Sequence, residues 1–172
     1  RFKLEIEMSD KTAESYPRLK SEDIEPLISG SKGGLYFYDF DRISYQFNKL
    51  KNTLPDNFKI HYALKANSNL TICRHLSSLG ASADVSSTGE ITAALKTGYL
   101  QEEIIFTGPG KTDEELKFAI DMSVGLIVVE SLNEARRLNA IAKQFDIVQN
   151  ILVRINPLYR VGSDSRFASI DS

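Results

Sequence analysis

The sequence of 172 residues has no tryptophan, two histidines and a single cysteine, Cys73. One cysteine excludes a disulfide within the chain, which is typical of proteins from a reducing compartment. Neither His61 nor His75 stands at a metal-ligand spacing from the other or from Cys73, so the sequence predicts no metal site.

Excess charge and long hydrophobic runs are also missing. The 21 basic and 23 acidic residues leave a net charge of −2, which does not favour a nucleic-acid or anionic-membrane surface. No apolar run approaches the roughly 20 residues that span a bilayer, and residues 1–10 lack the apolar core of a signal peptide. With 42% hydrophobic residues, we expect a soluble, cytoplasmic, globular protein with no membrane or nucleic-acid partner.

Short apolar runs alternate with helical patterns from residue 35 onward, which predicts an α/β fold. The runs from residue 124 to 129 and from 151 to 155 are almost continuously apolar, as expected for parallel strands buried on both faces. The predicted strands are Leu35–Tyr38, Lys59–Leu64, Ala81–Ser86, Ile104–Phe106, Leu126–Val129 and Ile151–Ile155.

Three of the predicted helices begin with a capping-box pattern, in which a hydroxyl residue is followed three positions later by glutamate. The pairs are Ser87 with Glu90, Thr112 with Glu115, and Ser131 with Glu134. Each pair is expected to satisfy two backbone amides reciprocally.

Successive strand–helix units imply a parallel sheet, which fits either a doubly wound open sheet or a (βα)₈ barrel. A barrel takes roughly 250 residues, so only about five units fit here and the barrel is expected to be incomplete. Residues 1–34 do not follow the period. We expect them to form a leader segment, and residues 35–172 to form the first part of the α/β domain.

Polar residues gather where the predicted strands end, the edge at which parallel α/β proteins build their sites. Lys65 ends the first strand of the periodic region, and alternation places it on the same face as His61 and Ala63. Burial at that edge would lower the pKa of the amine and make it a nucleophile. The alternative is an ordinary lysine that reaches solvent or a carboxylate.

Four motifs resemble the fold-type III pyridoxal-phosphate-dependent decarboxylases, the family of diaminopimelate, ornithine and arginine decarboxylases. They occur in the family's order, from the lysine motif to the end of the fifth barrel strand. The motifs are Tyr62-Ala-Leu-Lys-Ala-Asn67, Asp84-Val-Ser-Ser-Thr-Gly-Glu90, Phe106-Thr-Gly-Pro-Gly-Lys-Thr112 and Val153-Arg-Ile-Asn-Pro157. The resemblance favours the first five units of a (βα)₈ barrel that binds pyridoxal phosphate.

The resemblance also implies roles for four residues. Lys65 would hold the cofactor as a Schiff base, and Glu90 would approach its pyridine nitrogen. By pattern alone, Glu90 is a capping carboxylate. Asp84 would lie close to the cofactor, although a strand-end aspartate can equally bond nearby amides. Arg154 would join the site's charge network near Glu90 or Asp84, with a structural salt bridge as the alternative.

The implied activity is decarboxylation of an L-amino acid, either diaminopimelate or a carrier-protein-bound amino acid. A homodimer with shared active sites is implied as well, with the leader packing on a later β-domain. Alternatives of the same fold are an amino-acid racemase, a cofactor-carrying protein and a non-catalytic regulator. A phosphate loop at Gly108–Thr112 is not predicted, because Ile105 stands where that motif needs its first glycine.

Overall fold

The computed structural model describes residues 21–30, 33 and 35–156, and the chain divides into two units, residues 1–52 and 53–172. The first unit contains helix α1 (Ser21–Ser29) and most of helix α2 (Phe40–Thr53). The strand predicted over Leu35–Tyr38 is wrong, because these residues form neither helix nor strand. In the part of the chain that the structure describes, no helix combines the length and the hydropathy needed to cross a membrane.

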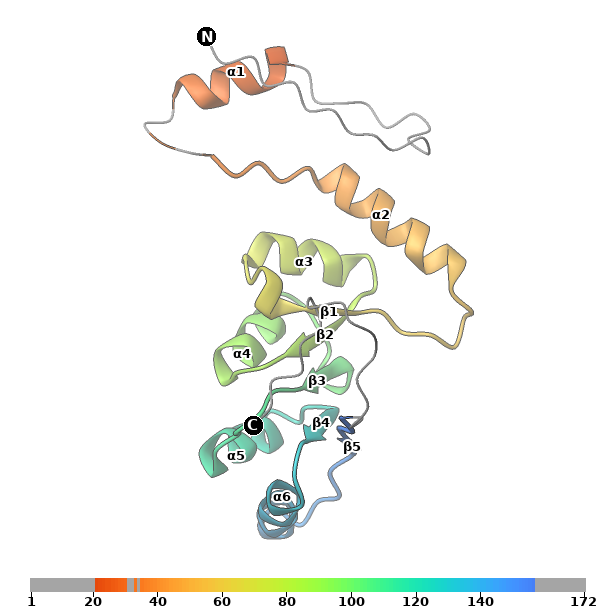
Figure 1. Ribbon diagram of the computed structural model, residues 1–172, viewed down its shortest axis with the longest axis vertical. Coiled ribbons are helices and arrows are strands. Elements are labelled where there is room, and N and C mark those ends of the chain that lie inside the picture. The colour runs from red at the N-terminus through yellow and green to blue at the C-terminus, as the bar shows by residue number, and fades with distance from the viewer. Residues whose placement is uncertain (1–20, 31–32, 34, 157–172) are drawn as a thin grey trace, which may run out of the picture. The chain divides into compact units, whose positions relative to one another are not determined.

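The second unit alternates strands with helices (Figure 1). Each strand but the last is followed by an α-helix, and two short 3₁₀ turns flank the sheet. The strands are β1 (His61–Ala63), β2 (Ser82–Val85), β3 (Ile104–Phe106), β4 (Leu126–Val129) and β5 (Ile151–Val153). The helices are α3 (Leu70–Ser78), α4 (Thr88–Lys96), α5 (Asp113–Asp121) and α6 (Leu132–Gln144), and the turns are η1 (Leu64–Ala66) and η2 (Gln101–Glu103).

The strand order distinguishes the two architectures that the sequence left open. The five strands form one parallel sheet in the order β1-β2-β3-β4-β5, so every strand pairs with its neighbour in the sequence. A doubly wound sheet reverses its strand order at a switch point, whereas a (βα) barrel adds each strand on the same side. Figure 1 accordingly shows α3 to α6 following one another in chain order along the sheet. The predicted α/β fold with a parallel sheet is confirmed, and the described residues contain four strand–helix units and a fifth strand.

The core of this unit lies between the sheet and its helices. Alternate residues of β2, Ala83 and Val85, are fully buried, as are Ile104 and Phe106 of β3. Only glycine fits at position 125, just before β4, because a Cβ there would overlap the backbone of Glu102. This close approach is part of the contact that brings β4 beside β3, since the Gly125 amide also donates to the Gln101 carbonyl.

The predicted helix starts are confirmed, but only one has the complete reciprocal box. At α5, the Thr112 side chain accepts from the Glu115 amide and Glu115 accepts from the Thr112 amide. Ser87 and Ser131 also cap α4 and α6. Glu90 and Glu134, however, accept from the amide of the residue before the capping serine, not from the amide of the serine itself. The reciprocal arrangement expected at these two helices is therefore wrong in this detail.

Candidate active site

The carboxyl ends of all five strands meet at one edge of the sheet, because every pairing is parallel. In register, Ala63 pairs with Asp84 and Val129 pairs with Val153. Lys65, Asp84 and Arg154 therefore belong to the same edge, at the first, second and fifth strands. This is where the sequence predicted a site.

Lys65 lies in the 3₁₀ turn η1, not on the strand. β1 ends at Ala63, so the strand alternation expected to continue to Lys65 does not reach it. Lys65 is exposed while the preceding Leu64 is fully buried, so the expected burial of the lysine is also not found. The turn anchors itself on one side through Leu64 and presents the amine of Lys65 on the other.

A hydrogen bond from Tyr62 closes this turn. Its hydroxyl donates to the backbone carbonyl of Asn67 over 2.9 Å, and so spans the three residues of η1. The thiol of Cys73 approaches the same carbonyl at 3.9 Å. Burial raises the pKa of Cys73, opposed by a backbone hydrogen bond and reinforced by the charge of Glu90, so this thiol stays protonated. Cys73 is thus a buried packing residue beneath the turn.

Tyr99 lies in the same buried region with its hydroxyl unpaired. The residue is 4% exposed, and its hydroxyl has no hydrogen-bond partner among the described residues. Burial raises its pKa far above the ordinary value, with smaller contributions from Cys73 and Tyr62. A neutral, unpaired phenol here carries the desolvation cost without a compensating bond.

Asp84 receives a short hydrogen bond across the sheet. The hydroxyl of Thr107, directly after β3, donates to its Oδ1 atom over 2.7 Å. The sequence offered nearby backbone amides as the alternative partners of Asp84, so this side-chain partner was missed. The contact fixes the carboxylate at the carboxyl end of β2, close to the turn that carries Lys65, since Asp84 pairs with Ala63.

Glu90 is engaged with the loop between β2 and α4. Its Oε2 atom accepts from the Ser86 amide at 2.7 Å and from the Ser86 hydroxyl at 3.1 Å, while its own amide donates to Ser87. The structure therefore supports the capping role of Glu90 directly. The same contacts hold the carboxylate at the edge of the sheet where β2 ends.

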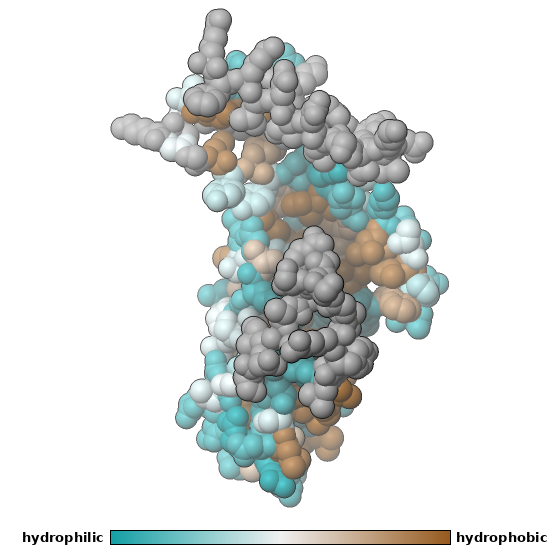
Figure 2. All heavy atoms as spheres, in the orientation of Figure 1, coloured by the Kyte–Doolittle hydropathy of each residue, from teal (hydrophilic) through white to brown (hydrophobic). Residues whose placement is uncertain are grey.

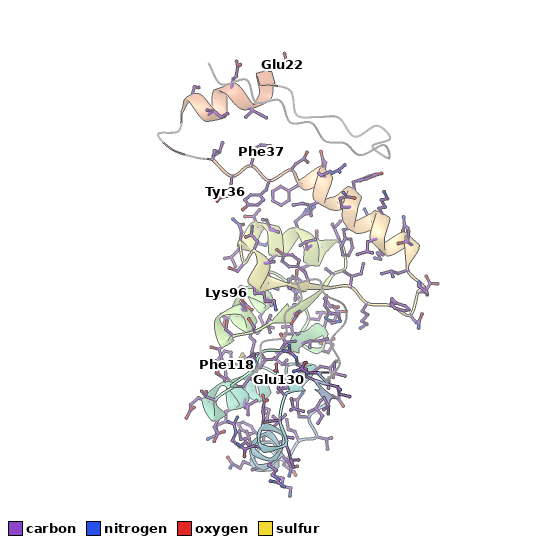
Figure 3. All side chains as sticks on the ribbon, viewed as in Figure 1. Glu22, Tyr36, Phe37, Lys96, Phe118 and Glu130 are labelled. Atoms are coloured by element: carbon purple, nitrogen blue, oxygen red, sulfur yellow. The ribbon has the colours of Figure 1, made fainter. Side chains whose placement is uncertain are left out.

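Arg154 pairs with Glu130, not with the expected Glu90 or Asp84. Its Nη1 atom lies 3.2 Å and 3.3 Å from the two carboxylate oxygens of Glu130, and its Nε atom donates to Asn156. The Arg154 side chain is 51% exposed, so it is not buried as the apolar run had suggested. Glu130 follows β4 directly and is labelled in Figure 3.

A buried ion pair lies behind this edge and was not predicted. The Nζ atom of Lys111 lies 2.9 Å from the Oε1 atom of Glu134, with side chains 2% and 5% exposed. The sequence placed Glu134 in a helix cap and Lys111 in the Phe106–Thr112 motif, with no contact expected between them. Nothing in the spacing of 23 residues between them signals their contact.

The edge thus combines an exposed primary amine, two fixed carboxylates and a guanidinium. No group of three or more histidine, cysteine or acidic side chains able to hold a metal ion occurs within residues 21–30, 33 and 35–156. An exposed amine at the same edge as carboxylates is suited to binding an aldehyde that carries a basic ring.

Comparison with known proteins identifies similar chains. Residues 40–168 match the family model described as pyridoxal-dependent decarboxylase, pyridoxal binding domain. A diaminopimelate decarboxylase of Helicobacter pylori is 40% identical over 134 residues, which cover 77% of this chain and 33% of that protein. The L-glutamyl-[BtrI acyl-carrier protein] decarboxylase of Niallia circulans is 30% identical, with 84% and 34% covered.

Solved structures show the same similarity. The crystal structure of diaminopimelate decarboxylase from Helicobacter pylori complexed with L-lysine superimposes with a TM-score of 0.73 and 38% identity. That match covers 77% of this chain and 34% of the other. The chain therefore spans about a third of the length of the relatives it matches.

Proposed function

Because the chain belongs to the pyridoxal-dependent decarboxylases, whose pyridoxal-binding domain it matches over residues 40–168, we propose that the full-length protein decarboxylates an L-amino acid. The observation that carries the proposal is the exposed Lys65, held in a closed turn at the edge where all five strands end. A carbon dioxide-releasing enzyme of this family needs an amine in such a place for its cofactor.

The donor set of this edge fits pyridoxal phosphate. Lys65 would hold the cofactor through its amine, with Asp84 on the neighbouring second strand and Arg154 directly after the fifth strand at the same edge. When bound, the cofactor supplies an electron-withdrawing ring that accepts the electron pair left by the departing carboxylate. The protein's part is to place charged groups around that ring.

The charged groups have distinct tasks in this proposal. Asp84, fixed by Thr107, contributes negative charge beside the amine of Lys65. Arg154, held by Glu130, contributes a directed positive charge at the far side of the described sheet. Thr107 holds Asp84 by a short contact, and Glu130 holds Arg154 by two longer ones, so each charge has a defined partner at the edge before a ligand arrives.

Glu90 is assigned to the cofactor's pyridine nitrogen, where a carboxylate favours the protonated form of the ring. The observation that supports this role is its fixed position at the end of β2. The contacts with Ser86 give it a second, structural role, and the two roles predict different results on substitution.

The substrate proposed is diaminopimelate or an amino acid bound to a carrier protein, because relatives with both printed activities match this chain. We propose further that the full-length protein is a cytoplasmic homodimer with shared active sites. Residues 1–34 would form a leader that packs on a later β-domain.

Carbon dioxide release separates decarboxylation from the other activities that this fold supports. The full-length enzyme, loaded with pyridoxal phosphate, is incubated with diaminopimelate in heavy water. We expect stoichiometric carbon dioxide and lysine. Exchange of the α-proton without carbon dioxide release would instead indicate a racemase, and neither signal with this or a carrier-bound substrate would indicate a regulator or a cofactor-carrying protein.

A further inference from the structure

Among the ion pairs of the described residues, Lys111 has the most buried charged side chain. Its side chain is 2% exposed, and the three N–H donors of its ammonium group meet three acceptors from the protein. The acceptors are the carbonyls of Gly108 at 2.7 Å and Val128 at 2.6 Å, and the Glu134 carboxylate at 2.9 Å. The Phe106 ring, 5.3 Å away, adds a cation–π contact.

These three acceptors lie on three different segments of the chain. Gly108 belongs to the loop after β3, Val128 to strand β4, and Glu134 to the first turn of α6. A single ammonium group therefore ties the loop after β3, strand β4 and helix α6 together at the carboxyl edge of the sheet. With three acceptors around its ammonium group, Lys111 is engaged in structural contacts.

Glu134 connects Lys111 to Glu130, the ion-pair partner of Arg154. While its Oε1 atom binds Lys111, its Oε2 atom accepts from the Glu130 amide over 2.9 Å. The carboxylate of Glu130 in turn receives the guanidinium of Arg154 on both oxygens. A continuous series of contacts therefore runs from the buried Lys111 to Arg154 at the edge.

The burial of the pair indicates that it contributes more than local stability. Removing both charges from water is costly, and apolar side chains of similar volume often replace a buried ion pair without loss of stability. What apolar side chains cannot replace is the acceptor for the Glu130 amide. The function that depends on charge at these two positions is thus the placement of Glu130.

We propose that Lys111 and Glu134 are positioning residues. They fix the backbone at Glu130, and Glu130 in turn holds the guanidinium of Arg154 in place. This inference rests on the proposed function, in which Arg154 binds the cofactor. It predicts that the pair affects cofactor binding only through Arg154.

A double-mutant cycle on the full-length enzyme tests this dependence. Lys111→Met/Glu134→Met is made in the wild-type background and in the Arg154→Ala background, and each apoenzyme is titrated with pyridoxal phosphate. In the wild-type background we expect the dissociation constant to rise about tenfold, and in the Arg154→Ala background less than about twofold. Melting temperatures comparable within each background show that the replaced core still packs.

Equal losses in both backgrounds would overturn the proposal, because the pair would then act on the fold and not through Arg154. Unchanged affinity in the wild-type background would overturn it as well. Hydrogen exchange at the Glu130 amide gives a readout that does not need the cofactor, and we expect faster exchange in the double variant. If the wild-type enzyme binds no pyridoxal phosphate, the proposed function fails, and unaltered exchange at Glu130 would then separately refute the positioning.

Discussion

Two lysines stand near strand ends in this chain, and their surroundings assign them to different tasks. Lys65 is exposed in a turn, whereas Lys111 is buried with every donor satisfied. A nucleophilic amine must be accessible to its partner, and of these two lysines Lys65 is the exposed one. The environment, not the residue type, therefore distinguishes the candidate cofactor lysine from the structural one.

Removing the side-chain hydroxyl is expected to have opposite effects on stability at Tyr99 and at Tyr62, the two tyrosines near the Lys65 turn. Tyr99→Phe removes a buried hydroxyl that has no partner among the described residues, so we expect the free energy of unfolding to rise by about 1 kcal/mol. Tyr62→Phe removes the bond that closes the turn, so we expect a fall of about 1 kcal/mol. Urea unfolding of the full-length protein measures both, each serving as the control for the other. A loss of stability in Tyr99→Phe would mean that its hydroxyl has a partner.

Among the helices, α4 and α6 begin in the same way. In both, a serine caps the helix and the glutamate three residues later accepts from the amide before that serine. Glu90 in α4 and Glu134 in α6 are therefore equivalent residues of the second and fourth units. Glu134 also binds a buried lysine through its second oxygen, whereas Glu90 accepts from the Ser86 hydroxyl on the same oxygen that accepts from the amide.

Substitution of Glu90 distinguishes its role in the helix cap from its proposed role at the cofactor. Glu90→Gln keeps an oxygen that can accept from Ser86, so we expect little change in melting temperature. It removes the negative charge, so we expect turnover to fall by about a hundredfold. Steady-state carbon dioxide release and thermal unfolding measure the two effects.

Glu115→Gln is the matched control, because Glu115 caps α5 through the reciprocal box and has no proposed role in catalysis. It should leave turnover unchanged. Turnover near the wild-type value in Glu90→Gln as well would restrict Glu90 to the helix cap.

The periodic elements could be predicted from the sequence because hydrophobic alternation and helix caps are local signals. Strands β3 and β4 match the prediction at both ends, and Ser87, Thr112 and Ser131 cap the three predicted helices. The apolar run at residues 35–38 looked equally strand-like. A strand, however, needs a neighbouring backbone to pair with, and no local pattern reveals one.

The edge that carries the site could be predicted, but its contacts could not. Strand ends locate Lys65, Asp84 and Arg154, since parallel pairing brings them to one side. Thr107, the partner of Asp84, is 23 residues away in the sequence, and Glu130, the partner of Arg154, is 24 residues away. Each partner belongs to an adjacent unit. Such pairs depend on register and side-chain direction, which one sequence does not specify.

For the whole molecule, the described sheet presents apolar side chains at its last strand. Val153 is 67% exposed and Ile155 is 82% exposed, and brown hydrophobic atoms reach the surface in the lower part of Figure 2. The relatives are about three times longer than the part matched here. We propose that further strands of the full-length barrel cover this surface and complete the site.

The most direct test of the account is reductive trapping on the full-length protein. The protein is incubated with pyridoxal phosphate, reduced with borohydride and mapped by peptide mass, with Lys65→Arg and Lys111→Arg examined in parallel. We expect one pyridoxyl adduct on Lys65, absent from Lys65→Arg and never located at position 111. An adduct spread over surface lysines, or one that persists in Lys65→Arg, would contradict the assignment of Lys65 as the cofactor lysine.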